Sequence, residues 1–205
     1  MSTGLNNWAT IIRVMTKEII IAVAIGIGLS ASCGFRVFIP MLVASVAAKT
    51  GFLPVQEGFQ WLAGWPAIFC FGTATFIEIL AYYIPFVDNF LDGVTTPLAF
   101  ISGTVLMTSV LPVDNDFLKW ATGVITGGGA AATVQGGTVL TRLASSKLTA
   151  GTGNAVVATG EHAAALSASV LSLVFPVVVA LIVIILVSFI LLKFGNKLFS
   201  SRNKN

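Results

Sequence analysis

Long apolar stretches recur along the chain from Ile19 to Leu192, and they constrain the fold more than any other feature of the sequence. A helix needs about 20 apolar residues to cross the hydrocarbon of a bilayer. Apolar residues make up 56% of the 205 residues, and only 9% of the residues are charged. No polar stretch is long enough for a separate soluble domain. The sequence therefore predicts an all-α, polytopic membrane protein whose main partner is the lipid bilayer.

Charge and motifs exclude several function classes. A net charge of +3 is too small for the basic face of a nucleic-acid-binding protein. Gly127 to Gly129 are not followed by the Lys and the Ser or Thr that end a phosphate-binding loop. No Ser/His/Asp or Cys/His set has a spacing that indicates catalysis, and His162 beside Glu161 falls short of a metal site. We therefore expect no enzyme activity, no cofactor, no metal and no nucleic-acid partner.

Six apolar segments are predicted to cross the membrane. They comprise residues 18–48, 61–84, 96–111, 119–142, 154–175 and 176–193. Apolar residues at helical spacing in residues 1–17 predict an amphipathic helix that lies at the membrane interface, and residues 194–205 form a basic tail. With six crossings both termini lie on one side. Most Lys and Arg residues then lie inside if that side is the cytoplasm, as the positive-inside rule requires.

The first segment is too long for one straight crossing. A single helix over residues 18–48 would be about 46 Å long, whereas the hydrocarbon is roughly 30 Å thick. We therefore expect this segment to be tilted or broken, with the break near Gly34. A ridge of small residues at every fourth position, including Gly26 and Gly34, would let another backbone come close.

The two halves of the chain share a glycine pattern. When Lys17 is superposed on Lys119, Gly34 falls on Gly136, and other glycines also coincide. This predicts an internal duplication, with residues 18–111 as the first membrane repeat and 119–193 as the second. Three crossings per repeat would make the two repeats inverted, as in many transporters. We expect glycine breaks near both Gly34 and Gly136.

Three ionisable residues lie inside apolar sequence and are candidate site residues. A lone guanidinium at the position of Arg36 costs at least a few kcal/mol unless it is paired or hydrated. It is interpreted either as an anion contact or gate, or as a clamp on carbonyl groups freed by a helix break. Glu78 and Glu161 could bind a cation, exchange a proton, or tie two helices together. The sequence leaves open which of these glutamates pairs with Arg36.

Asp88 and Asp92 form a second candidate site at the predicted cytoplasmic mouth. They lie four residues apart, so they would share one face of a helix. Together they could attract cations, or they could belong to a solvated turn.

Several stretches resemble a known family. The most specific are Gly34 to Pro40 (Gly-Phe-Arg-Val-Phe-Ile-Pro) and Pro85 to Asp92 (Pro-Phe-Val-Asp-Asn-Phe-Leu-Asp). Gly151 to Asn154 and Glu161 also belong to the resemblance. Over most of residues 19–176 the chain resembles a bacterial integral-membrane family, domain of unknown function 4126. The resemblance implies a membrane fold in a bacterial cytoplasmic (inner) membrane, and it implies no activity.

These features lead to two functional hypotheses. The first is a small transporter or channel for an ion or small solute, with a pathway between the repeats lined by Arg36, Glu78, Glu161, Gly34 and Gly136. The second is a membrane scaffold or accessory subunit whose small-residue ridges bind other helices. A homo-oligomer is compatible with either hypothesis.

Overall fold

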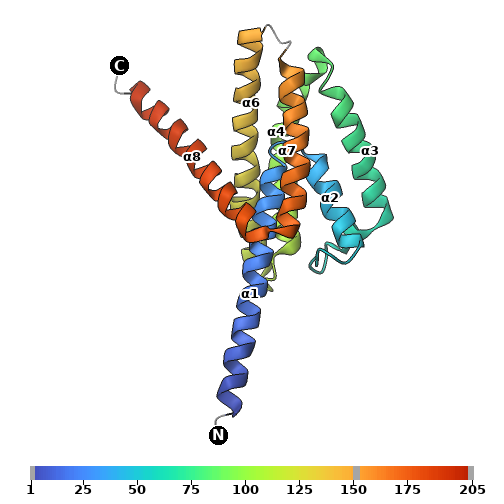
Figure 1. Cartoon of the computed structure of the whole chain (residues 1–205), viewed down its shortest axis with the longest axis vertical. Helices are drawn as coiled ribbons and strands as arrows, with labels where there is room; N and C mark the ends of the chain where they lie inside the picture. Colours follow the sequence, from blue (N-terminus) through green and yellow to red (C-terminus); the bar gives the residue numbers. More distant parts are fainter. Residues whose placement is uncertain (1–2, 150–152, 203–205) are drawn as a thin grey trace.

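The computed structural model describes the backbone of residues 3–149 and 153–202, and the side chains of residues 15–84, 91, 93–149 and 153–193. Within this part of the chain all regular elements are helical (Figure 1), which confirms the predicted all-α fold. In chain order the elements are α1 (Thr3–Ser32), α2 (Phe38–Lys49), the 3₁₀ turn η1 (Gln60–Ala63), α3 (Trp65–Ala81), α4 (Pro85–Val110), α5 (Asp116–Thr122), the π-helical segment η2 (Gly123–Gly128), α6 (Gly129–Thr149), α7 (Asn154–Val174) and α8 (Pro176–Arg202).

Several helices have the length and composition of membrane spans. Four windows of the described chain meet both criteria: Met15–Ser32, Gly93–Val110, Asn154–Val174 and Pro176–Lys193. The helices α2 and α3 are apolar but shorter. The segment predicted as a crossing at 119–142 is not among these windows. The chain is thus a membrane protein by the character of its helices, but the predicted set of six crossings is not reproduced.

The first predicted crossing is broken, and its second arm turns back. Helix α1 ends at Ser32 and α2 begins only at Phe38. Along α1, a Cβ added at Gly28 would touch the Ser172 side chain near the end of α7. Further on, the Nη2 atom of Arg36 donates a hydrogen bond of 3.3 Å to the carbonyl oxygen of Ala158, near the start of α7. The chain therefore runs antiparallel to α7 up to the break.

Helix α2 then descends along the same helix. At its start Ile39 lines one cavity with Thr159 of α7, and near its end Ala47 lines another with Leu173. Residues 18–48 thus form a helical hairpin, not a single crossing, as the direction of α1 and α2 in Figure 1 also shows. Irregular backbone of this kind is tolerated at membrane depth only where protein or a cavity surrounds it.

The two halves are not inverted copies over their best-matched segments. The hydroxyl of Ser30 on α1 donates to the carbonyl oxygen of Gly103 on α4 at 2.7 Å, whereas Gly26 faces Met107. In the second half, Gly127 also faces Gly103. Gly123, earlier in that segment, faces Thr108 of α4. Both segments therefore run antiparallel to α4 and parallel to each other, whereas an inverted repeat would set them antiparallel.

The expected break near Gly136 is absent. The elements α5, η2 and α6 follow one another without interruption, and Gly136 lies inside α6. A single glycine costs a helix only about 1 kcal/mol and does not end it. The irregularity of this segment lies at the π-helical turns of η2, where Gly127 and Gly103 bring the backbones of η2 and α4 into close approach.

Two further boundaries differ from expectation. Residues 3–17 are continuous with the helix that follows, as one α1, so the predicted interfacial helix is not a separate element. The third segment begins at Pro85 and not at Thr96, with Pro97 inside α4. Proline suits the first turn of a helix because its missing N–H would be unpaired there anyway.

Candidate functional site: a buried ion cluster at the helix break

Arg36 lies in the break between α1 and α2 and is almost completely buried. Its Nη2 atom forms an ion pair of 2.9 Å with the Oε2 atom of Glu161 on α7. The partner of Arg36, left open by the sequence, is therefore Glu161. An unpaired guanidinium at this depth would be strongly destabilising, so this contact fixes the hairpin to α7.

A second arginine shares the same carboxylate. The Nε atom of Arg142, on α6, lies 3.1 Å from Oε1 and 3.0 Å from Oε2 of Glu161. Its Nη2 atom also pairs with Oε2. Glu161 thus joins α1–α2, α6 and α7 at one point. Two guanidinium groups on one carboxylate leave this triad with one net positive charge.

An aromatic ring lies against both guanidinium groups. The Cζ atom of Arg36 is 3.4 Å from the ring centroid of Tyr82, and the Cζ atom of Arg142 is 4.2 Å from it. The Tyr82 hydroxyl bonds the Thr95 hydroxyl at 3.3 Å, and that oxygen also accepts from Gln135 at 3.1 Å. The quadrupole of the ring stabilises the arginine charges by cation–π interaction. We call Arg36, Tyr82, Arg142 and Glu161 the ion cluster.

Glu78 serves a different purpose from Glu161. Its carboxylate oxygens accept hydrogen bonds from the backbone N–H groups of Val37 at 3.0 Å and of Phe38 at 3.2 Å. These groups open α2, and the first N–H groups of a helix have no partner within it. Glu78, on α3, therefore caps the N-terminus of α2 and stabilises the helix break beside Arg36.

The ion cluster retains unused hydrogen-bonding capacity. The Nε and Nη1 atoms of Arg36 are buried and have no hydrogen-bond partner among the described residues. Buried donors without partners are rare and costly, although the Tyr82 ring offsets part of this cost. The guanidinium could therefore donate further hydrogen bonds to an anion or a polar solute.

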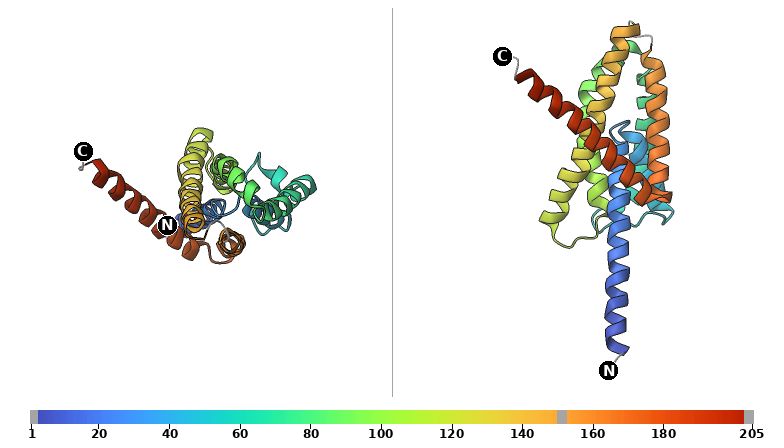
Figure 2. Two further views of the ribbon diagram at one scale, coloured as in Figure 1. Left: turned by 90° about the horizontal axis from the view of Figure 1, so that it is seen from above. Right: turned by 60° about the vertical axis from the view of Figure 1, so that its left-hand side comes forward.

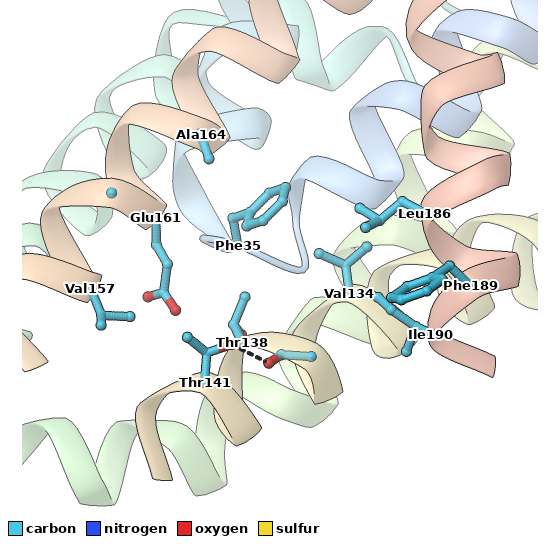
Figure 3. A pocket seen from close by; sticks show the side chains of 12 residues that line it. Phe35, Val134, Thr138, Thr141, Val157, Glu161, Ala164, Leu186, Phe189 and Ile190 are labelled. Carbon is cyan, nitrogen blue, oxygen red and sulfur yellow. Dashed lines mark hydrogen bonds between the residues drawn. The ribbon is translucent and has the colours of Figure 1, made fainter. Parts of the chain in front are cut away.

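A cavity of about 390 Å³ reaches the cluster from the side of α6, α7 and α8. Among the described residues that line it, Glu161 is the one ionisable residue. In Figure 3 the carboxylate points from α7 toward Thr138 and Thr141 of α6, while Phe35 and Val134 line the neighbouring wall. Except for these polar groups, the wall is mainly apolar. The cavity thus connects the outside of the helix bundle with the buried charge.

The two candidate glycines, Gly34 and Gly136, have different surroundings. A Cβ added to Gly34 would lie 2.5 Å from the Ala131 carbonyl oxygen and 2.8 Å from the Gln135 nitrogen, so this position requires a residue without a side chain. A Cβ added to Gly136 would meet nothing within 4 Å. Gly34 therefore lies at the cluster, whereas nothing in the contacts of Gly136 requires glycine.

The positions of the Asp88 and Asp92 side chains relative to the ion cluster lie outside what the structure describes. Both residues lie in the first turns of α4. Their predicted role at a cytoplasmic mouth stays a prediction. Among described residues no group of three or more His, Cys, Asp or Glu side chains could hold a metal ion.

Arg142 and Tyr82 are the site residues that sequence reasoning missed. Arg142 ends the predicted crossing 119–142 and Tyr82 lies near the end of 61–84, and basic and aromatic residues are common at such ends. One signal could have found Arg142. It stands as far before the connection between α6 and α7 as Glu161 stands after it, so an antiparallel helix pair brings the two to one level.

Comparison with known proteins agrees with the resemblance noted in the sequence. No curated protein and no solved structure matches the chain. A family model described as Domain of unknown function (DUF4126) matches residues 23–194, which include the whole ion cluster and both arms of the hairpin after Val23. The chain therefore belongs to the DUF4126 family.

Proposed function

We propose that this protein is a small transporter or channel for an ion or small solute in the bacterial cytoplasmic membrane. The observation that carries the proposal is the ion cluster, buried at a helix break and reached by a cavity. Ionised groups inside a membrane protein are costly, and they commonly mark the path of an ion or substrate. Glu161 lines this cavity, and its ion-pair partner Arg36 has two donor atoms without a partner among the described residues.

The broken hairpin supports the same function. Transporter sites are commonly built from interrupted helices, because the interruption exposes backbone groups and helix ends to a substrate. Here the start of α2 lies beside Arg36 and is held by Glu78. Inversion of the two halves is not part of the proposal.

One small-residue ridge behind the scaffold hypothesis is used inside the chain. The small residues of the ridge in residues 18–48 contact helices of the same chain: Gly26 faces α4, and Gly34 faces α6. They are therefore used within the fold and are not available to another protein. A scaffold function would have to use the exposed apolar faces of α3 and α8 instead.

Flux through proteoliposomes tests the proposal. Purified protein should carry at least one of a panel of monovalent cations, halides, protons and small organic anions across the vesicle membrane. Arg36→Lys keeps the charge but loses the guanidinium fork, so it should lower that flux while the protein stays monodisperse. Glu57→Gln, at an exposed loop position, removes a carboxylate far from the cluster and should leave the flux unchanged. The absence of flux for the whole panel would contradict the proposal.

A further inference from the structure

A lateral groove runs between α6 and α8. The cavity beside Glu161 shares Gly137, Thr141, Phe189 and Ile190 with a second cavity of about 420 Å³, so the two lie side by side along the groove. The second cavity continues along α6 past Leu140 and Ala144 and ends at Lys193 on α8. Figures 1 and 2 show why the groove exists: α8 diverges from α6 as both helices rise.

The walls of the outer cavity are mainly apolar. Phe189 and Ile190 form the α8 side, and Leu140 and Ala144 form much of the α6 side. Helix α8 itself is a candidate membrane span between Pro176 and Lys193, so the groove opens toward the hydrocarbon of the bilayer. An extended apolar chain matches such walls.

Basic residues flank the outer end of the groove. Lys193 lines it at the point where the apolar part of α8 ends. Lys147 lies on the last turn of α6, one turn beyond the lining residue Ala144. Of the described residues that line the outer cavity, none is acidic. Lysines at the end of a membrane span attract anionic lipid headgroups.

We infer that the groove between α6 and α8 binds an anionic phospholipid, with one acyl chain along the apolar walls and the phosphate at Lys193 and Lys147. A second copy of this chain is a poorer occupant, because its own α8 would bring another Lys193 to the basic mouth. The bilayer supplies a ligand that has both an apolar chain and a negative charge. This inference does not depend on transport, since a bound lipid would stabilise the position of α8 in either case.

Native mass spectrometry tests the inference on the full chain. The protein is released from nanodiscs that contain equal amounts of phosphatidylglycerol and phosphatidylcholine, and the retained lipids are counted. We expect retained phosphatidylglycerol to exceed phosphatidylcholine on the wild-type protein. In the double variant Lys147→Gln with Lys193→Gln, that preference should fall by about tenfold.

Two further variants separate the groove from general surface charge. Ala144→Phe fills the exposed mouth of the groove and should remove the retained lipid whatever its headgroup. The matched control Lys49→Gln with Lys119→Gln removes the same charge at the other end of the bundle and should keep the preference. Equal retention of the two lipids by the wild type, an unchanged preference in the Lys147/Lys193 variant, or full retention by Ala144→Phe would overturn the inference. A dimer that carries no lipid would also overturn it.

Discussion

Glu161 is the residue on which both buried arginines depend. If Glu161→Gln removes the carboxylate, two buried guanidinium groups lose the ion pair that they share, which costs about 3–5 kcal/mol. Arg36→Met or Arg142→Met leaves one intact pair, so each should destabilise the protein less. We expect this order in the free energies of unfolding measured by denaturant titration in micelles. Equal losses for all three variants would show that the charges are not coupled through Glu161.

Tyr82 tests the aromatic part of the cluster. Tyr82→Leu removes the ring from both guanidinium groups and should cost about 2 kcal/mol, because the cation–π contacts are buried. Tyr82→Phe keeps the ring and loses only the hydroxyl contact with Thr95, so its cost should stay near 1 kcal/mol. The same titration measures both values. A Phe variant as unstable as the Leu variant would assign the stabilisation to the hydroxyl group instead.

At the scale of residues, apolar context made some of the cluster predictable. Arg36 and Glu161 stand out because a charge inside an apolar segment needs a partner. Arg142 did not stand out, since it lies near a segment end where basic residues are common. The capping role of Glu78 could not be predicted either, because the N–H groups that it binds exist as a set only after the hairpin has formed.

At the scale of elements, the hairpin depends on its cap. Glu78→Ala leaves the N–H groups of Val37 and Phe38 unpaired, and each buried unpaired group costs about 1–3 kcal/mol. We expect faster hydrogen exchange in the first turn of α2, with exchange in α8 unchanged. Glu57→Ala, in an exposed loop, should alter neither helix. Unchanged protection of α2 in the Glu78→Ala variant would contradict the capping role.

Variants of Gly34 and Gly136 test whether the two glycines, which coincide in the predicted repeat, are both required for close packing. Gly34→Ala places a Cβ against the backbone of α6 and should destabilise the protein. Gly136→Ala adds a methyl group in open space inside a helix, where alanine is favoured by about 1 kcal/mol. Thermal unfolding should therefore move in opposite directions for the two variants. Similar shifts in melting temperature for the two variants would indicate that Gly34 and Gly136 have equivalent roles, as the predicted repeat implies.

The break in the first segment was predictable from its length, but the direction of α2 was not. A segment that is longer than the hydrocarbon can tilt, kink or turn back. Its length does not distinguish these conformations, which depend on its contacts with other helices. The same limit explains the predicted inversion. It followed from counting three crossings in each half, and the structure does not confirm that count, because the first segment forms a hairpin in which α2 runs back along α7.

At the scale of the whole molecule, this hairpin changes the expected sidedness of the termini. Six crossings would place both ends of the chain on one side. If the first segment turns back and the other five predicted segments cross, the two ends face opposite sides. The start of α1 and the end of α8 accordingly lie toward opposite ends of the bundle (Figure 1). Because the basic tail follows Lys193, we expect the α8 end to be cytoplasmic and the start of α1 to lie outside.

Cysteine labelling in intact membranes measures this sidedness. In a Cys70→Ser background, single cysteines at Lys17, Lys49, Lys147 and Lys193 are exposed to a membrane-impermeant maleimide. Lys17→Cys and Lys49→Cys should react from the outside, because α1 and α2 form two arms of one hairpin. Lys147→Cys and Lys193→Cys should react only in inside-out vesicles. Labelling of Lys17→Cys and Lys193→Cys from the same side would mean that residues 18–48 cross the membrane after all.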